Sequence, residues 1–172
     1  MTDLATITQR GTLTFVRHLP GPIDRVWAYL TDPTFLVTWF SDGVVADSVG
    51  GEVRFEMGAE GRITAYEPPH LLEYTWNEED ETCPIVDTLV RWELTEESSG
   101  VRLTLTHARL PENEVLGHGA GWHAFLQRLA ACVDGREPEP ISELFARLKI
   151  EYVPLVQAAG IATPSSTNAD VS

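Results

Sequence analysis

Between residues 44 and 107 the chain alternates apolar and polar residues with a period of two, the pattern of β-strands that bury one face. Turn signals divide this stretch into strand-sized segments: Gly50-Gly51, residues 58–61, Pro68-Pro69, residues 78–81 and residues 98–100. Short strands in such close succession predict an antiparallel meander. One face of that sheet is apolar, so another element has to cover it.

The apolar face of the predicted sheet holds several large aromatic residues. Its members are Val53, Phe55, Met57, Ile63, Ala65, Leu72, Tyr74, Trp76, Val86, Thr88, Val90, Trp92, Leu94, Val101, Leu103, Leu105 and His107. The opposite face carries charged residues and threonines, so we expect it to be solvated. His107 is the one imidazole in phase with the apolar positions, and alternation therefore turns it inward.

The predicted cover is one long helix over residues 115–133, in which Trp122, Phe125, Leu126 and Leu129 recur at helical spacing. Gly135 ends this helix. Before the meander, residues 12–19 read as a first strand. Two short helices follow it, one beginning at Pro22 and one over residues 33–40.

The length of 172 residues predicts one main domain with appendages. We place the main domain at residues 12–135, after an N-terminal segment at 1–11. A helical extension follows at 136–160, which Pro154 should bend or end, and then a flexible tail at 161–172. The apolar side of the extension, with residues such as Leu148 and Tyr152, should dock on its own domain or on a second copy, giving a homodimer.

The formal charge of −14 repels phosphate backbones and anionic lipid surfaces, so neither nucleic acid nor membrane insertion is an expected mode of binding. Cys83 and Cys132 lack a CxxC context, and the N-terminus lacks the features of a secretory signal. These observations predict a cytoplasmic protein. Lys149 is the sole lysine, so amine chemistry has almost no candidate.

Five segments occur in an informative order: PGPIDRVWAYLTDPTFLVTWF (20–40), GGEVRFEM (50–57), GRITAYEPPHLLEYTW (61–76), VRLTLTHARLP (101–111) and GWHAFLQRLAACV (121–133). Together they resemble the activator-of-heat-shock-protein-ATPase-like family of the SRPBCC (START, Bet v-like) superfamily, over about residues 12–134.

This resemblance implies an α+β helix-grip fold. A bent, seven-stranded antiparallel sheet would wrap around the long C-terminal helix and enclose an elongated apolar cavity. Superfamily members use that cavity for hydrophobic small molecules such as lipids, sterols and polyketides, and some for cyclase or dehydratase chemistry. The helix after Arg136 is an addition to the family pattern.

Nine residues are the predicted ligand-binding set: Arg17, Trp39, Phe55, Tyr74, Trp76, Trp92, His107, Trp122 and Phe125. His107 has three interpretations: a buried imidazole bonded to backbone or to Glu114, a ligand contact, or a general base. Arg17 either pairs with an acid or carbonyl, or anchors an acidic ligand group. The aromatic residues are either core or cavity wall.

Other motifs are weaker. His118 and His123 are five residues apart on a helix, which does not suit one metal ion, and we predict no metal and no cofactor. Residues 78–81 read as a charged hairpin loop. Gly117, Gly119 and Gly121 at the start of the long helix either leave room for a ligand entrance or fray.

The sequence therefore favours a protein that binds a hydrophobic or aromatic small molecule without catalysis. A chaperone-associated interaction protein is one alternative, for which a chaperone would be the partner. A cyclase- or hydrolase-type enzyme is another, and it would need polar groups such as His107, Tyr74 and Arg17 to converge in the cavity.

Overall fold

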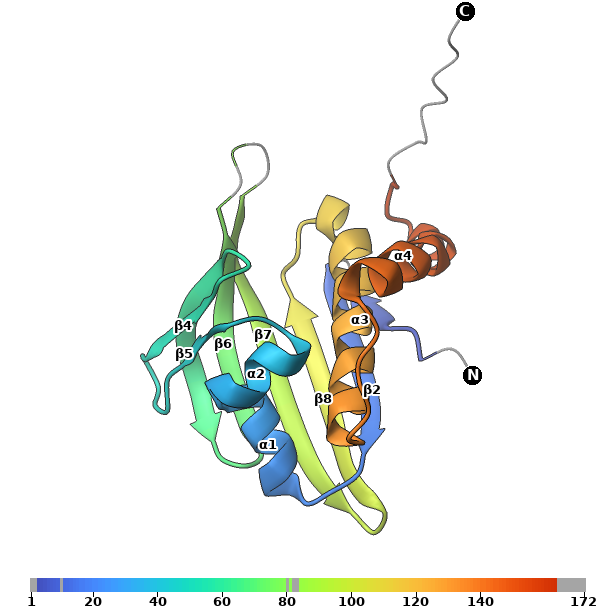
Figure 1. The fold of residues 1–172 in the computed structure, drawn as a ribbon. Coiled ribbons are helices and arrows are strands. Elements are labelled where there is room, and N and C mark those ends of the chain that lie inside the picture. The colour runs from blue at the N-terminus through green and yellow to red at the C-terminus, as the bar shows by residue number, and fades with distance from the viewer. Residues whose placement is uncertain (1–2, 10, 80, 82–83, 164–172) are drawn as a thin grey trace, which may run out of the picture.

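The computed structural model describes residues 3–9, 11–79, 81 and 84–163. A single antiparallel sheet curves around the long helix α3, and two short helices fill the space beside it (Figure 1). The strands are β1 Thr6–Gln9, β2 Thr12–Leu19, β3 Gly43–Val45, β4 Glu52–Phe55, β5 Ala59–Glu67, β6 Leu71–Glu78, β7 Ile85–Glu97 and β8 Gly100–Ala108. The helices are α1 Ile23–Thr31, α2 Pro33–Trp39, the 3-10 turn η1 Glu112–Glu114, α3 Val115–Val133 and α4 Ile141–Ala158.

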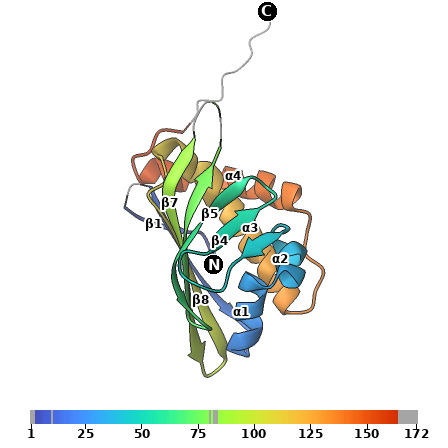
Figure 2. The same ribbon diagram turned by 90° about the vertical axis from the view of Figure 1, so that its left-hand side faces the viewer.

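The sheet has the order β1-β2-β8-β7-β6-β5-β4-β3. The first long strand, β2, pairs with the last, β8, so the meander closes back onto the N-terminal part of the chain. Figure 2 shows the sheet with α1, α2 and α3 on its concave side. The predicted α+β helix-grip fold is confirmed, with eight strands instead of seven. The additional strand is β1, which lies inside the predicted N-terminal segment and pairs with β2.

The alternation of buried and exposed residues follows the prediction along β2, β6 and β8 but fails at the start of β7. Ile85 and Thr88 both face inward, whereas Val86 between them is 62% exposed. Asp87 adopts φ 55°, and the register with β6 shifts between Trp76 and Glu78. A β-bulge therefore inserts an extra residue and moves Val86 to the solvent side. Met57 is likewise exposed, because β4 ends at Phe55.

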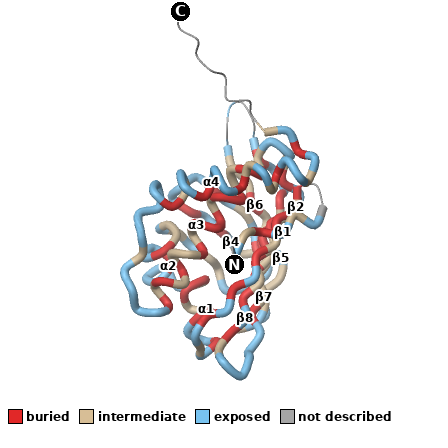
Figure 3. Tube along the Cα trace, turned by 90° about the vertical axis from the view of Figure 1, so that its right-hand side faces the viewer, coloured by how far each residue is buried: buried red, intermediate tan, exposed pale blue. Residues whose placement is uncertain are grey.

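Helix α4 runs through Pro154 to Ala158, so of the two predicted effects of the proline, an end of the helix is wrong. Tyr152 and Val156, on either side of the proline, are fully buried, and their packing holds the helix where propensity alone would end it. The buried side of α4 consists of Leu144, Leu148, Tyr152 and Val156. Helix α4 packs on α3 of the same chain, and Figure 3 shows the two helices next to each other, with buried segments in both.

The docking of α4 on its own domain settles where its apolar face is buried. A homodimer through α4 stays a prediction, and it would have to use other residues of the helix, such as Ile150, which is 75% exposed. Cys83 and residues 164–172 of the predicted tail lie outside the described residues. Within the described part of the chain, no helix combines the length and the apolarity that a membrane span requires.

The contact between α3 and α4 depends on Gly119. A Cβ at this position would lie 2.8 Å from a ring carbon of Tyr152, whereas a Cβ at Gly117, two residues earlier, would meet nothing within 4 Å. The hydroxyl of the same tyrosine accepts the backbone N–H of Ala5 over 2.9 Å. Tyr152 thus joins the N-terminal segment, α3 and α4.

We expect Gly119→Ala to lower the free energy of unfolding by about 1–3 kcal/mol, because the added methyl group forces Tyr152 out of its position. Gly117→Ala is the matched control and should be up to about 1 kcal/mol more stable than the wild type, since it adds helix propensity in open space. Urea unfolding measures both. Equal effects of the two substitutions would contradict the close packing.

Candidate functional site

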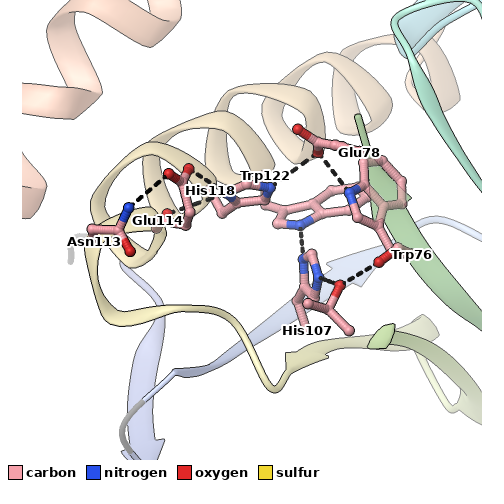
Figure 4. A network of polar contacts seen from close by, with 8 residues as sticks. Trp76, Glu78, His107, Asn113, Glu114, His118 and Trp122 are labelled. Atoms are coloured by element: carbon pink, nitrogen blue, oxygen red, sulfur yellow. Dashed lines mark hydrogen bonds and ion pairs between the residues drawn. The ribbon is translucent and has the colours of Figure 1, made fainter. Parts of the chain in front are cut away.

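A chain of hydrogen bonds connects α3 to the sheet at His107. Nε1 of Trp122 donates to Nδ1 of His107 over 2.9 Å. An indole nitrogen can only donate, so Nδ1 is the acceptor and Nε2 carries the hydrogen. Nε2 therefore donates to the hydroxyl of Thr88 over 2.8 Å, and that hydroxyl donates to the carbonyl of Trp76 over 2.7 Å (Figure 4).

His107 is fully buried within this network. Burial lowers the pKa of His107 well below its usual range, and the neighbouring His118 lowers it further. Of the three interpretations of His107, the buried, bonded imidazole is the one that the geometry supports. Its partners are Thr88 and Trp122, not Glu114.

The interior of the grip, the space between the concave face of the sheet and α3, is filled by aromatic side chains. The sequence predicted these side chains to face inward. Trp39 packs edge-on against Trp92 with ring centroids 6.2 Å apart, and Phe55 lies 6.3 Å from Tyr74. Nε1 of Trp92 donates to the hydroxyl of Tyr74 over 3.0 Å. Burial raises the pKa of Tyr74 above its usual range, so this phenol stays neutral. These four residues are core.

Space remains at one end of the grip, between the first half of α3, the start of α4 and the end of β6. A pocket of about 310 Å³ opens there. Gly117 and Gly121 on α3 contribute no side chain to it, which is why the aromatic residues around them do not close the space. The pocket is lined by Phe40, Met57, Trp76, Glu78, Glu114, Gly117, His118, Gly121, Trp122, Phe125, Ile141 and Phe145.

Phe40 is central to the pocket wall. Its ring stacks on Trp122 with centroids 5.5 Å apart and an interplanar angle of 9°. It also meets Phe125 edge-on at 4.6 Å and Phe55 at 4.9 Å. The pocket wall is thus continuous with the aromatic core and is held in place by it.

The polar end of the pocket is formed by His118, Glu78 and Glu114 (Figure 4). Nδ1 of His118 lies 3.1 Å from the backbone oxygen of Glu114, and its Nε2 lies 3.2 Å from Oε1 of Glu78. That same oxygen accepts Nε1–H of Trp76 over 2.6 Å. Both ring nitrogens of His118 face oxygen acceptors, so the two bonds form together when both nitrogens carry hydrogen.

Three of the nine predicted ligand-binding residues line the pocket: Trp76, Trp122 and Phe125. The other six do not: Arg17, Trp39, Phe55, Tyr74, Trp92 and His107. Strand alternation indicates which face a residue occupies but not how deep it lies beneath the opening. The prediction also missed His118, which it had considered only as a metal ligand. The glycines at 117 and 121 were the available signal for an entrance.

Arg17 lies in a separate polar cluster beneath the N-terminal segment. Its guanidinium donates to the carbonyl oxygens of Asp3 and Val16, each over 2.8 Å. Burial lowers its pKa, and the charge of Asp3 opposes that shift. In the same cluster, burial and the charge of Arg17 lower the pKa of His123 to about 4. The carbonyl partner among the predicted alternatives is therefore the one observed.

A comparison with protein families gives one match, to the family described as "Activator of Hsp90 ATPase homolog 1-like protein", over residues 20–134. The chain belongs to this family. The match confirms the resemblance in the sequence and includes η1, α3 and every strand from β3 to β8. Helix α4 lies beyond the matched residues, yet Ile141 and Phe145 from it line the pocket.

Two solved structures show the same fold. The crystal structure of CalU16 from Micromonospora echinospora is 28% identical, with a TM-score of 0.72, and the alignment covers 84% of this chain and 88% of that one. The solution structure of the protein encoded by gene BPP1335 from Bordetella parapertussis is 29% identical, with a TM-score of 0.71, covering 86% and 87%. A comparison with curated proteins gave no match. The helix-grip fold, which this chain shares with the two structures, is a ligand-binding fold.

The lowered pKa values of the buried histidines make the free energy of unfolding depend on pH. His107 and His123 have lower pKa values in the folded protein than the usual value of about 6.5 in the unfolded chain. The unfolded chain therefore binds more protons below pH 6.5. Above that pH the two histidines leave the free energy of unfolding unchanged. Below it they lower the free energy of unfolding as the pH falls, by at most about 1.4 kcal/mol per pH unit for each histidine.

We expect His107→Gln to reduce this slope as the pH falls below about 6.5, because the variant keeps a donor and an acceptor but does not titrate. Urea unfolding of both proteins at several pH values measures the slope. A variant whose stability falls with pH as steeply as that of the wild type would show that His107 is not held neutral.

Proposed function

We propose that this protein binds a small, flat, apolar molecule in the pocket at the end of the grip, as a binding protein without catalysis. The observation that carries the proposal is an aromatic-walled space of about 310 Å³ that the side chains of α3, α4 and the sheet leave open. Its size is at the lower end of the ~300–1,000 Å³ typical of ligand sites. The size favours a compact ring system over a long-chain lipid.

The expected affinity follows from the apolar area that such a ligand buries. About 250 Å² at ~25 cal/mol/Å² gives a gross gain of about 6 kcal/mol, and association costs offset a large part of it. Micromolar dissociation constants are therefore the scale for a generic apolar ligand. A cognate ligand would add contacts to the polar end, at His118, Glu78 and Glu114.

The arrangement of polar groups favours binding over catalysis. The three groups that the sequence offered for an enzyme, His107, Tyr74 and Arg17, are bonded to other parts of the protein and do not line the pocket. His118 does line it, but both of its ring nitrogens lie within hydrogen-bond distance of protein oxygens. It would have to give up one of these bonds to act as a general base.

The alternative function, a chaperone-associated protein, would use an exposed apolar surface. The described residues with exposed large apolar side chains are spread over several elements, with examples in Val37 on α2, Val86 on β7 and Ile150 on α4. Two others, Met57 and Ile141, line the pocket. The pocket, in contrast, brings several apolar side chains together on one surface. We therefore favour the pocket as the binding site over a chaperone-binding surface.

Filling the pocket from Gly117 tests the proposal. We expect Gly117→Leu to weaken binding of the neutral fluorophore N-phenyl-1-naphthylamine at least tenfold, because the new side chain occupies open space in the pocket. Gly117→Ala, which adds a single methyl group, should change the affinity by about twofold or less. A twofold change corresponds to roughly half the transfer free energy of one buried CH₂.

A fluorescence titration measures both variants against the wild type. The proposal predicts a graded series: near-wild-type affinity for the alanine variant and a large loss for the leucine variant. Lack of saturable binding by the wild type, or equal affinities of the wild type and Gly117→Leu, would rule out this pocket as the binding site.

A further inference from the structure

Aromatic side chains make up much of the wall of the pocket. Rings of Phe40, Trp76, Trp122, Phe125 and Phe145 all line it. The faces of such rings carry a negative quadrupole and attract a cation within about 6 Å of the ring centroid, most strongly where water is excluded.

One of these five rings already has a cation nearby. Nζ of Lys149 lies 5.8 Å from the centroid of Phe145. Lys149 is not among the residues that line the pocket, so the proposed cation site consists of the other four rings. Tryptophan is the residue type whose ring binds cations best. The ring centroids of Trp76 and Trp122 lie 5.3 Å apart.

The charges at the polar end have the sign that complements a cation. Glu78 and Glu114 each contribute a carboxylate, and His118 is the one basic side chain among the described residues that line the pocket. When His118 is protonated the three groups sum to −1, and when it is neutral they sum to −2. The local charge is negative in both states, so a ligand carboxylate would be repelled and an ammonium group attracted.

The charge of the whole chain adds to this preference. A net charge of −14 produces a negative field at long range, which raises the local concentration of cations and lowers that of anions. The aromatic wall, the two carboxylates and the field of the whole chain thus favour the same kind of ligand.

We propose that the pocket selects small aromatic amines in their protonated form, with the ring system between the aromatic walls and the ammonium group directed toward Glu78 and Glu114. This inference rests on the proposed function, since it requires the pocket to bind a small molecule. It adds the charge of the ligand, which the apolar walls alone do not specify.

Three ligands with the same naphthalene body separate the two proposals. They are 1-ethylnaphthalene, which is neutral, 1-naphthylmethylamine, which is protonated at pH 7, and 1-naphthylacetate, which is anionic. At low ionic strength the amine should bind at least about fivefold more tightly than the ethyl compound, and the acetate should bind more weakly than both. Isothermal titration calorimetry measures the three affinities. The advantage of the amine should shrink in 0.5 M NaCl, because salt screens the partly exposed carboxylates.

Substitution of the carboxylates tests their role. Glu114→Gln and Glu78→Gln should each reduce the ratio of amine to ethyl affinity by about threefold or more, because each removes one negative charge and keeps hydrogen-bond acceptors. Glu96→Gln is the control. It makes the same change in net charge on the exposed end of β7, near the hairpin to β8 at the opposite end of the sheet (Figure 1). The ratio in each variant is measured on one preparation, so a partly unfolded sample does not affect it.

Each outcome is decisive. Binding of 1-ethylnaphthalene with no advantage for the amine would overturn the inference and leave the proposed function intact. Binding of none of the three compounds would overturn both. An equal loss of selectivity in Glu96→Gln and Glu114→Gln would assign the preference to overall charge and overturn the role of the pocket carboxylates.

Discussion

The hydrogen bond from Trp122 to His107 connects the two layers of this protein. It fixes the rotation of α3 against β8, and through Thr88 it continues to β7 and β6. With Trp122 held in this orientation, His118 lies one turn earlier on the same helix and reaches Glu78 at the end of β6. The aromatic wall and the polar end of the pocket are both consequences of this attachment, which a neutral, single-tautomer imidazole makes possible.

The aromatic residues have two roles that depend on their depth in the grip. At the centre, Trp39, Tyr74 and Trp92 fill the space between helix and sheet and donate or accept hydrogen bonds among themselves and with the backbone. Toward the open end, glycines replace side chains on α3, and the rings around them become a surface instead of a core. The pocket of about 310 Å³ therefore lies at the end of the space between α3 and the sheet, and its volume limits the size of a ligand.

The sequence predicted the fold well, because periodicity determines which residues face the core. The bounds of α3 and the inward faces of β6 and β8 agree with the structure, since local spacing governs them. Features that depend on distant contacts were not predictable in this way: the bulge at Asp87, the strand β1 and the passage of α4 through Pro154. The candidate site was predicted only in part, since its wall includes residues of α4. The apolar side of that helix indicated that it docks, but not that it docks on α3 beside the pocket.

The bond between Ala5 and Tyr152 spans 147 positions of the chain. On a ribosome, the N-terminal segment therefore emerges long before the residue that holds it has been made. Strand β2 likewise waits for β8, its partner in the sheet. The N-terminal edge of the fold can close only after α4 has been made, so a ribosome-bound fragment that ends before α4 would keep the backbone N–H of Ala5 without this partner.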